Sequence, residues 1–142
     1  MYKHILLASD FSPEAVRAED RAVEVAKLSG AKLSIIHVVD YYPSMQLEGG
    51  LAMLPNIEEK LNENARSDMD ACIERLDVKP ESEHIGHGPP KAVIVDYADE
   101  ISADLVVLGS HGRHGLGLLL GSTANGVLHT AKCDVLAVRV YE

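Results

Sequence analysis

The sequence predicts one α/β domain with an open parallel sheet between two layers of helices, a three-layer α/β/α sandwich. Five short apolar runs alternate along the chain with four stretches of helical character. Alternating strands and helices form parallel βαβ units with right-handed crossovers, which place helices on the faces of the sheet. No linker, composition shift or internal repeat divides the 142 residues. We therefore expect a single domain, residues 1–142, with its own core.

The apolar runs mark the expected strands. Residues 5–8 and 105–108 are apolar without alternation, which is typical of parallel strands buried on both faces of a sheet. These two strands are therefore expected as central neighbours. The more polar run at residues 82–85 suggests a sheet edge. In full, strands are expected at residues 2–9, 32–38, 82–85, 105–108 and 135–140.

Helix signals separate these strands. Ser12 is a good N-cap, Pro13 suits the first helical position and Gly30 provides a stop, so a helix is expected to end near residue 29. Apolar residues at helical spacing predict a second helix over residues 57–76. A third helix follows Pro90, and a fourth is expected over residues 122–131. The long connection at residues 41–55 is interpreted either as a lid or as a surface loop.

Composition disfavours several classes of function. The formal net charge is -9, so the field of the protein repels the backbone of DNA or RNA. No apolar run is long enough to span a membrane, and the first residues resemble a strand rather than a signal peptide. Cys72 and Cys133 fit no metal spacing. A cytoplasmic protein with free thiols is expected, without nucleic-acid or membrane partners.

The candidate functional segment is the stretch of residues 109–123, which holds five glycines between an expected strand and an expected helix. Such glycines let backbone N–H groups point into one concavity, and the next helix N-terminus adds partial positive charge. This arrangement favours phosphate. Ligands of open α/β sheets bind beyond the carboxyl ends of strands, where the strand order reverses. The two central strands end near Asp10 and Gly109, so one crevice is expected to contain both.

Alternatives remain open for these residues. The glycine stretch is also consistent with a tight connection that holds no ligand. Asp10 either contacts a ligand or shapes the turn into the first helix, and one carboxylate can do both. Among the charged or titratable residues of the loop, Arg113 is the best suited to meet phosphate, because a guanidinium is always charged and reaches far. His114 is interpreted as a solvated loop residue.

The chain resembles the universal stress protein family over essentially its full length, and four segments carry the resemblance. They are residues 5–12, His37-Val38, residues 103–112 and Gly121-Ser122. The resemblance implies a Rossmann-like sheet of order 3-2-1-4-5, similar to that of the adenine-nucleotide alpha-hydrolases. It also implies a stress-response homodimer that binds a nucleotide without a well-defined catalytic reaction.

When the binding residues of the family are transferred to the matching positions of this sequence, the resemblance implies a site for ATP or another adenine nucleotide. Asp10 is expected at the adenine or ribose end, and Ser122 in the phosphate cradle at the helix start. A Mg²⁺ ion on the phosphates is compatible with this site, although no residue stands out as its ligand. The expected nucleotide-binding residues are Ala8, Ser9, Asp10, Val38, Leu108, Gly109, His111, Gly112, Arg113, Gly121, Ser122 and Thr123.

One segment departs from the family's ATP-binding pattern, in which nine residues separate the second glycine from Gly-Ser or Gly-Thr. Here eight residues, 113–120, separate Gly112 from Gly121. The missing residue lies in the turn expected around the β- and γ-phosphates. Losing two charge-assisted hydrogen bonds of roughly 1.5–3 kcal/mol each reduces affinity on the order of 10²–10⁴-fold.

Three outcomes follow from this shorter span. ATP binds if Gly115 and Gly117 let the backbone recover the geometry. If the geometry is not recovered, ADP or AMP bind in place of ATP, because they need fewer phosphate contacts. Alternatively, the protein is a nucleotide-free dimeric interaction module of the same family.

The last expected strand has the pattern of a paired sheet edge. An apolar edge that stays exposed is an aggregation hazard, so residues 135–140 are expected to pair with a second copy of the chain. Along this strand Val135, Ala137 and Arg139 alternate with Leu136, Val138 and Val140.

Catalysis is not indicated beyond a slow ATPase activity at most, because no pattern places a general base against a water or acceptor. The sequence His84-Ile-Gly-His87 spells a short motif of nucleotidylyltransferases, but it follows an edge-like strand rather than the first strand. It is interpreted as a chance match.

Overall fold

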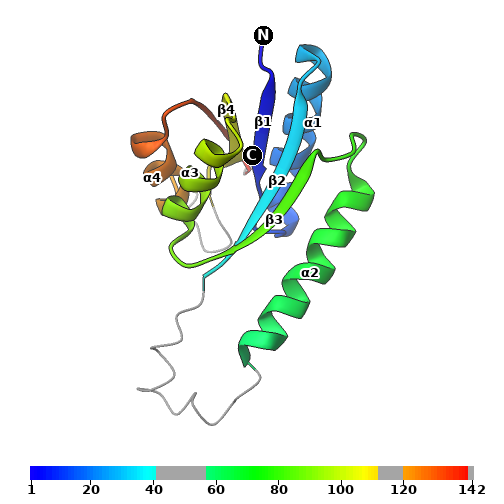
Figure 1. Ribbon diagram of the computed structural model, residues 1–142, viewed down its shortest axis with the longest axis vertical. Coiled ribbons are helices and arrows are strands. Elements are labelled where there is room, and N and C mark those ends of the chain that lie inside the picture. The colour runs from blue at the N-terminus through cyan, green and yellow to red at the C-terminus, as the bar shows by residue number, and fades with distance from the viewer. Residues whose placement is uncertain (41–56, 112–119, 141–142) are drawn as a thin grey trace.

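The computed structural model describes residues 1–40, 57–111 and 120–140. Within these ranges the chain forms the expected α/β/α sandwich around a five-stranded parallel sheet (Figure 1). The elements in chain order are β1 (His4–Ala8), the 3-10 turn η1 (Pro13–Ala15), α1 (Val16–Ser29), β2 (Lys32–Val39), α2 (Ile57–Arg75), β3 (Ser82–His87), α3 (Pro90–Glu100), β4 (Leu105–Gly109), α4 (Ser122–Thr130) and β5 (Asp134–Val138).

The strand order is β3-β2-β1-β4-β5, as the family resemblance implies. The two apolar strands β1 and β4 are central neighbours, with Leu6 paired to Val106. From β1 the chain builds the sheet first in one direction, through β2 and β3, and then in the other, through β4 and β5. The order therefore reverses between β1 and β4, which is where ligands of open α/β sheets bind.

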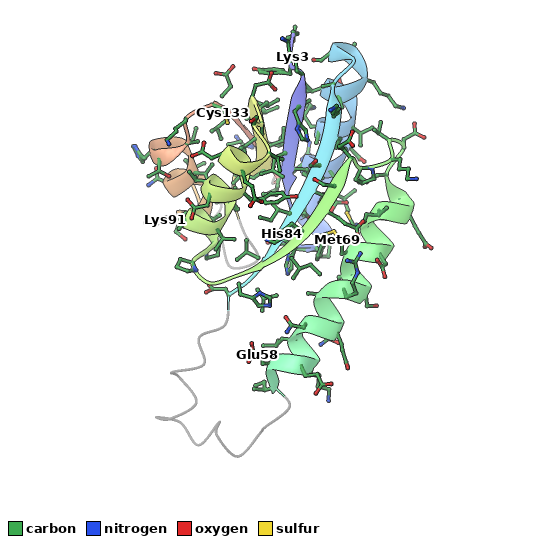
Figure 2. All side chains as sticks on the ribbon, viewed as in Figure 1. Lys3, Glu58, Met69, His84, Lys91 and Cys133 are labelled. Atoms are coloured by element: carbon green, nitrogen blue, oxygen red, sulfur yellow. The ribbon has the colours of Figure 1, made fainter. Side chains whose placement is uncertain are left out.

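In the described part of the chain, two helices cover each face of the sheet. Figure 1 shows α1 and α2 on one side and α3 and α4 on the other. The first layer packs small residues of α1 such as Ala22 and, from α2, Met69 and Cys72 against Ile5 and Leu7. Figure 2 shows Met69 on the side of α2 that is turned to the sheet. On the opposite face, the core contains Leu6, Ala8, Ile36, Ile94, Ala98, Val106, Leu108, Ala124 and Val127.

The first helix begins differently from the sequence-based expectation. Ser12 stands at the N-cap position, but its hydroxyl donates to Asp10 Oδ1 at 2.6 Å and makes no capping bond. The first turn is 3-10, and α1 proper begins at Val16. The end of α1 is as predicted, because Gly30 adopts the left-handed conformation with φ 68° that glycine tolerates best.

The last strand is shorter at its C-terminal end than predicted. β5 ends at Val138 instead of Val140. Val140 is nevertheless 6% exposed, because it packs over Gly109, where a Cβ would lie 2.9 Å from Val140 Cγ1. The apolar character of Val140 therefore reflects this contact rather than continuation of the strand.

Other predictions concern the edges and termini of the fold. The polar strand β3 lies at a sheet edge, as predicted. Cys72 is fully buried, whereas Cys133 is only half-buried at the start of β5. No helix in the described ranges is both long and apolar enough to cross a membrane. The lid or loop expected at residues 41–55 lies outside these ranges.

Candidate functional site

A crevice of about 770 Å³ opens beyond the carboxyl ends of β1, β2 and β4. Its volume is in the usual range for a small-molecule pocket, roughly 300–1,000 Å³. Residues 61–68 of α2 and the first turns of α3 and α4 complete its walls. The crevice therefore occupies the point of the sheet at which the strand order reverses.

Ten of the twelve sequence-predicted nucleotide-binding residues line this crevice. Gly112 and Arg113 lie outside the described residues, as do Gly115 and Gly117. The structure brings together Ala8, Ser9, Asp10, Val38, Leu108, Gly109, His111, Gly121, Ser122 and Thr123.

The N-terminus of α4 forms one end of the crevice. The backbone N–H of Gly121 donates to the Ser110 carbonyl at 2.7 Å, which joins the start of α4 to the end of β4. The first backbone bond within the helix runs from Asn125 to Gly121 at 2.9 Å, so the N–H groups of Ser122 and Thr123 precede the helical ladder. Among the residues that the structure describes, no side chain caps this terminus, and its first turn holds no acidic residue. Its partial positive charge therefore favours an anion.

Three carboxylates also line the crevice. Asp10, Asp40 and Asp68 line it from the end of β1, the end of β2 and α2. A ligand that carries both a phosphate and hydroxyl or amine donors suits this combination of a helix N-terminus and carboxylates. No group of three or more His, Cys, Asp or Glu side chains in the described ranges is arranged to hold a metal ion.

The turn that follows β1 is held by its own polar groups. Asp10 Oδ1 accepts hydrogen bonds from the Ser12 N–H at 3.0 Å and from the Ser12 hydroxyl at 2.6 Å. The carboxylate thus has the turn-shaping role that was one of the two expected roles of Asp10. Phe11 adopts φ 60°, which costs a residue with a side chain roughly 1–2 kcal/mol, so the turn is a strained one.

His37 also lines the crevice, although the sequence-based site omitted it. Its Nδ1 lies 2.8 Å from the Ser9 carbonyl oxygen, and since a carbonyl only accepts, Nδ1 carries the proton. The imidazole stacks on the Phe11 ring with centroids 4.4 Å apart. This stacking joins the ends of β1 and β2 and supports the strained conformation of Phe11.

A buried carboxylate lies beneath this turn. Glu19 of α1 is 2% exposed, and it accepts from the Ser9 hydroxyl at 2.9 Å and from Arg75 of α2 at 2.9 Å. Burial, together with the charge of Glu19, raises the pKa of the Cys72 thiol to about 12. The sequence carried one signal for this residue: Glu19 interrupts a stripe of small apolar residues that includes Ala15 and Ala22.

The His84-Ile-Gly-His87 segment takes no part in the crevice. His84 stacks on Tyr97 of α3 with ring centroids 4.6 Å apart, and Figure 2 shows it on the edge strand β3. His87 Nε2 donates to Asn62 Oδ1 of α2 at 2.5 Å. Because α2 and α3 cover opposite faces of the sheet, the two imidazoles cannot act on one phosphate, which agrees with a chance match.

The fold and the crevice together define a doubly wound α/β protein with a crevice at the switch point of its sheet. The chain belongs to the universal stress protein family, whose family model matches residues 1–139. It is 40% identical over 144 residues to Universal stress protein A homolog 1 of Coxiella burnetii, with 99% of each chain covered.

Two solved structures have the same fold. Universal stress protein UspA from Lactobacillus plantarum matches with a TM-score of 0.79 and 31% identity, over 97% of this chain and 98% of that one. A universal stress protein in complex with cAMP matches with a TM-score of 0.65 and 30% identity, over 99% and 98% of the two chains.

Proposed function

We propose that this protein is a cytoplasmic stress-response regulator that binds an adenine nucleotide in the β1–β4 crevice and acts as a homodimer. The observation that carries the proposal is the N-terminus of α4, which is not capped by any described side chain and opens into the same crevice as the ends of β1 and β2. A phosphate suits that terminus. The nucleotide then biases conformation or partner choice rather than undergoing a defined reaction.

The similar structure in complex with cAMP supports an adenine nucleotide as the ligand. In this chain, Val38 and Leu108 supply apolar walls for a base, and the carboxylates that line the crevice suit ribose hydroxyls. The span of eight residues between Gly112 and Gly121 favours a ligand with few phosphates. We therefore expect AMP, cAMP or ADP to bind at least as tightly as ATP. Any Mg²⁺ is held mainly by the phosphates of a di- or triphosphate.

Mass spectrometry and calorimetry test this proposal. Nucleotide released from freshly purified protein identifies the ligand, and titration with AMP, cAMP, ADP and ATP ranks the affinities. The proposal predicts a dissociation constant in the micromolar range for at least one of them. It fails if none binds below millimolar concentration.

A pair of substitutions at Ser122 tests whether α4 holds the phosphate. Ser122→Pro removes one backbone N–H, yet proline suits the first helical position, and Gly121 with φ -63° and ψ 156° has the conformation that a following proline requires. Ser122→Ala removes only the hydroxyl. We expect Ser122→Pro to weaken binding about tenfold while the circular dichroism spectrum stays unchanged. Equal affinity in wild type and Ser122→Pro contradicts a phosphate at this terminus.

The second candidate function is a nucleotide-free dimeric interaction module, and the shortened span 113–120 favours it. Insertion of one residue between Gly117 and Leu118 discriminates between the two functions. A gain of ATP affinity on insertion supports the module. Strong ATP affinity that is unchanged by the insertion excludes it.

The homodimer rests on the position of β5. This strand is the outer strand next to β4, and Val135, Leu136 and Ala137 are half-buried within the single chain. An apolar edge of this kind is stabilised by pairing with a second copy.

A further inference from the structure

We propose that Glu19 is a positioning residue of the nucleotide crevice, because it fixes the conformation of the Ser9–Phe11 turn. Arg75 of α2 pairs with Glu19, so this ion pair links the position of α2 to the conformation of the turn. The inference rests on the proposed function, because it concerns how the same site is held. Neither Glu19 nor Arg75 lines the crevice. Both act through Ser9, which does.

The Ser9 hydroxyl has two hydrogen bonds of opposite direction. It donates to Glu19 Oε2 at 2.9 Å and accepts from the Phe11 N–H at 3.1 Å. The carboxylate can only accept, so it orients the hydroxyl proton and leaves the lone pairs directed to Phe11. Without that carboxylate the hydroxyl is free to rotate, and the strained Phe11 loses the fixed acceptor of its N–H.

Arg75 in turn keeps the carboxylate in place. Glu19 is 2% exposed, and a buried carboxylate is costly unless it is paired and hydrogen-bonded. Arg75 Nη2 donates to Glu19 Oε1 at 2.9 Å from the last turn of α2, 56 residues further along the chain. The ion pair therefore fastens the C-terminal end of α2 to the underside of the crevice.

The N-terminal half of the same helix, together with the turn that follows it, forms a wall of the crevice and contributes Leu61, Asn64 and Asp68. Figure 1 shows this half of α2 reaching past the carboxyl ends of the strands. A ligand that contacts both the turn and α2 binds best when both are in place. By thermodynamic linkage, weakening the Arg75–Glu19 contact weakens ligand binding, and ligand binding strengthens that contact.

Hydrogen exchange of the Phe11 amide tests the first step without any ligand. We expect exchange at least tenfold faster than wild type in Glu19→Gln, in Ser9→Ala and in Arg75→Met, with the amide of Leu7 as the monitor of global opening. The matched control is Arg66→Met: Arg66 is also on α2, its side chain is 47% exposed against 48% for Arg75, and it pairs with Asp70 and Glu83. It should change the Phe11 rate less than twofold.

Arg75→Met leaves the buried Glu19 carboxylate unpaired and can destabilise the whole fold. The double variant Glu19→Gln/Arg75→Met removes both charges and controls for that effect. Its Phe11 amide should exchange no faster than that of Glu19→Gln alone, since both substitutions act through one carboxylate. Equal Phe11 protection in wild type and Glu19→Gln overturns the proposal. The proposal is also overturned if Arg66→Met accelerates exchange of the Phe11 amide as much as Arg75→Met does.

Nucleotide affinity tests the second step. If Glu19 acts through Ser9, Glu19→Gln weakens AMP binding about three- to tenfold in wild type but has no effect in a Ser9→Ala background. An equal loss in both backgrounds assigns Glu19 a general structural role and overturns the inference. If the wild type binds no adenine nucleotide, the proposed function fails, while the Phe11 exchange still decides whether Glu19 positions the turn.

Discussion

The Asp104 carboxylate fastens the start of β1 beside the start of β4. It accepts from the Lys3 N–H at 2.9 Å and from the His4 N–H at 3.0 Å, across a sequence separation of about 100 residues. Partial burial opposes its charge, but these backbone hydrogen bonds outweigh that effect and hold the pKa of Asp104 below its ordinary value. A single side chain thus helps to set the register of the two central strands.

The first prediction concerns Asp104→Asn. A carboxylate with a lowered pKa stabilises the fold above the pKa of the unfolded chain, about 3.9, and this stabilisation disappears as the pH falls through the folded value. We expect Asp104→Asn to cost about 1–2 kcal/mol in urea unfolding at pH 7, and much less at pH 2.5. The exposed Asp77→Asn, whose carboxylate pairs with Lys27, is the control and should cost less. A penalty independent of pH would contradict the account.

The second prediction concerns Cys72. Burial and the nearby Glu19 raise its pKa to about 12, so its thiolate fraction at pH 8 is on the order of 10⁻⁴. We expect iodoacetamide to alkylate Cys72 in the folded protein at least ~10³-fold more slowly than in the urea-unfolded chain. Half-buried Cys133, whose pKa is raised chiefly by burial and then by Asp134, should react faster than Cys72. Mass spectrometry of labelled peptides distinguishes the two, and rapid Cys72 labelling would be inconsistent with its burial.

At the scale of single elements, close packing decides where strands and helices meet. Gly86 of β3 is buried, and a Cβ at this position would lie 2.5 Å from Val93 Cγ1 of α3. The edge strand thus approaches its helix closely because this residue has no side chain.

The third prediction uses this contact. Gly86→Ala should destabilise the protein by about 1–3 kcal/mol, as overpacking does. Removal of the opposing methyl groups in Gly86→Ala/Val93→Ala should recover part of that loss, measured by urea unfolding. If the double variant is less stable than Gly86→Ala alone, the steric explanation is wrong.

Most elements could be predicted because local patterns determine them. Continuous apolar runs identified β1 and β4, and Gly30 marked the end of α1. The prediction was wrong where a distant contact determines the outcome. The sequence pattern predicted Val140 as part of the last strand, but this residue lies beyond β5 and is apolar because it packs over Gly109.

The candidate site likewise contains residues that could be predicted from the sequence and residues that could not. Residues at strand ends and at the helix start were predicted, since topology alone brings them together. The ion pair of Glu19 with Arg75 was not, because no local signal links two residues of different helices. The capping bond predicted for Ser12 does not form for a local reason, because the hydroxyl donates to the neighbouring Asp10 carboxylate.

At the scale of the whole molecule, the outer edge of β5 is the surface at which we propose that two copies of the chain pair. The Val138 carbonyl accepts from Ser110 on the β4 side, and since backbone groups alternate in direction, the Ala137 N–H points away from β4.

The fourth prediction follows from this direction. Ala137→Pro removes only an outward donor and should convert the proposed dimer into a monomer, whereas Ala137→Thr keeps the donor and should remain dimeric. Sedimentation velocity measures both. A dimeric Ala137→Pro would place the subunit contact elsewhere.

The crevice is itself a property of the whole chain, because it requires the reversal of strand order between β1 and β4. An NMR titration of the ¹⁵N-labelled protein with AMP tests most directly whether a nucleotide binds there. We predict saturable shifts of the Ser9, Val38, Ser122 and Thr123 amides, with the exposed α2 residue Glu58 unaffected. Shifts confined to other surfaces, or none up to millimolar AMP, would contradict the assignment of this crevice as the nucleotide site.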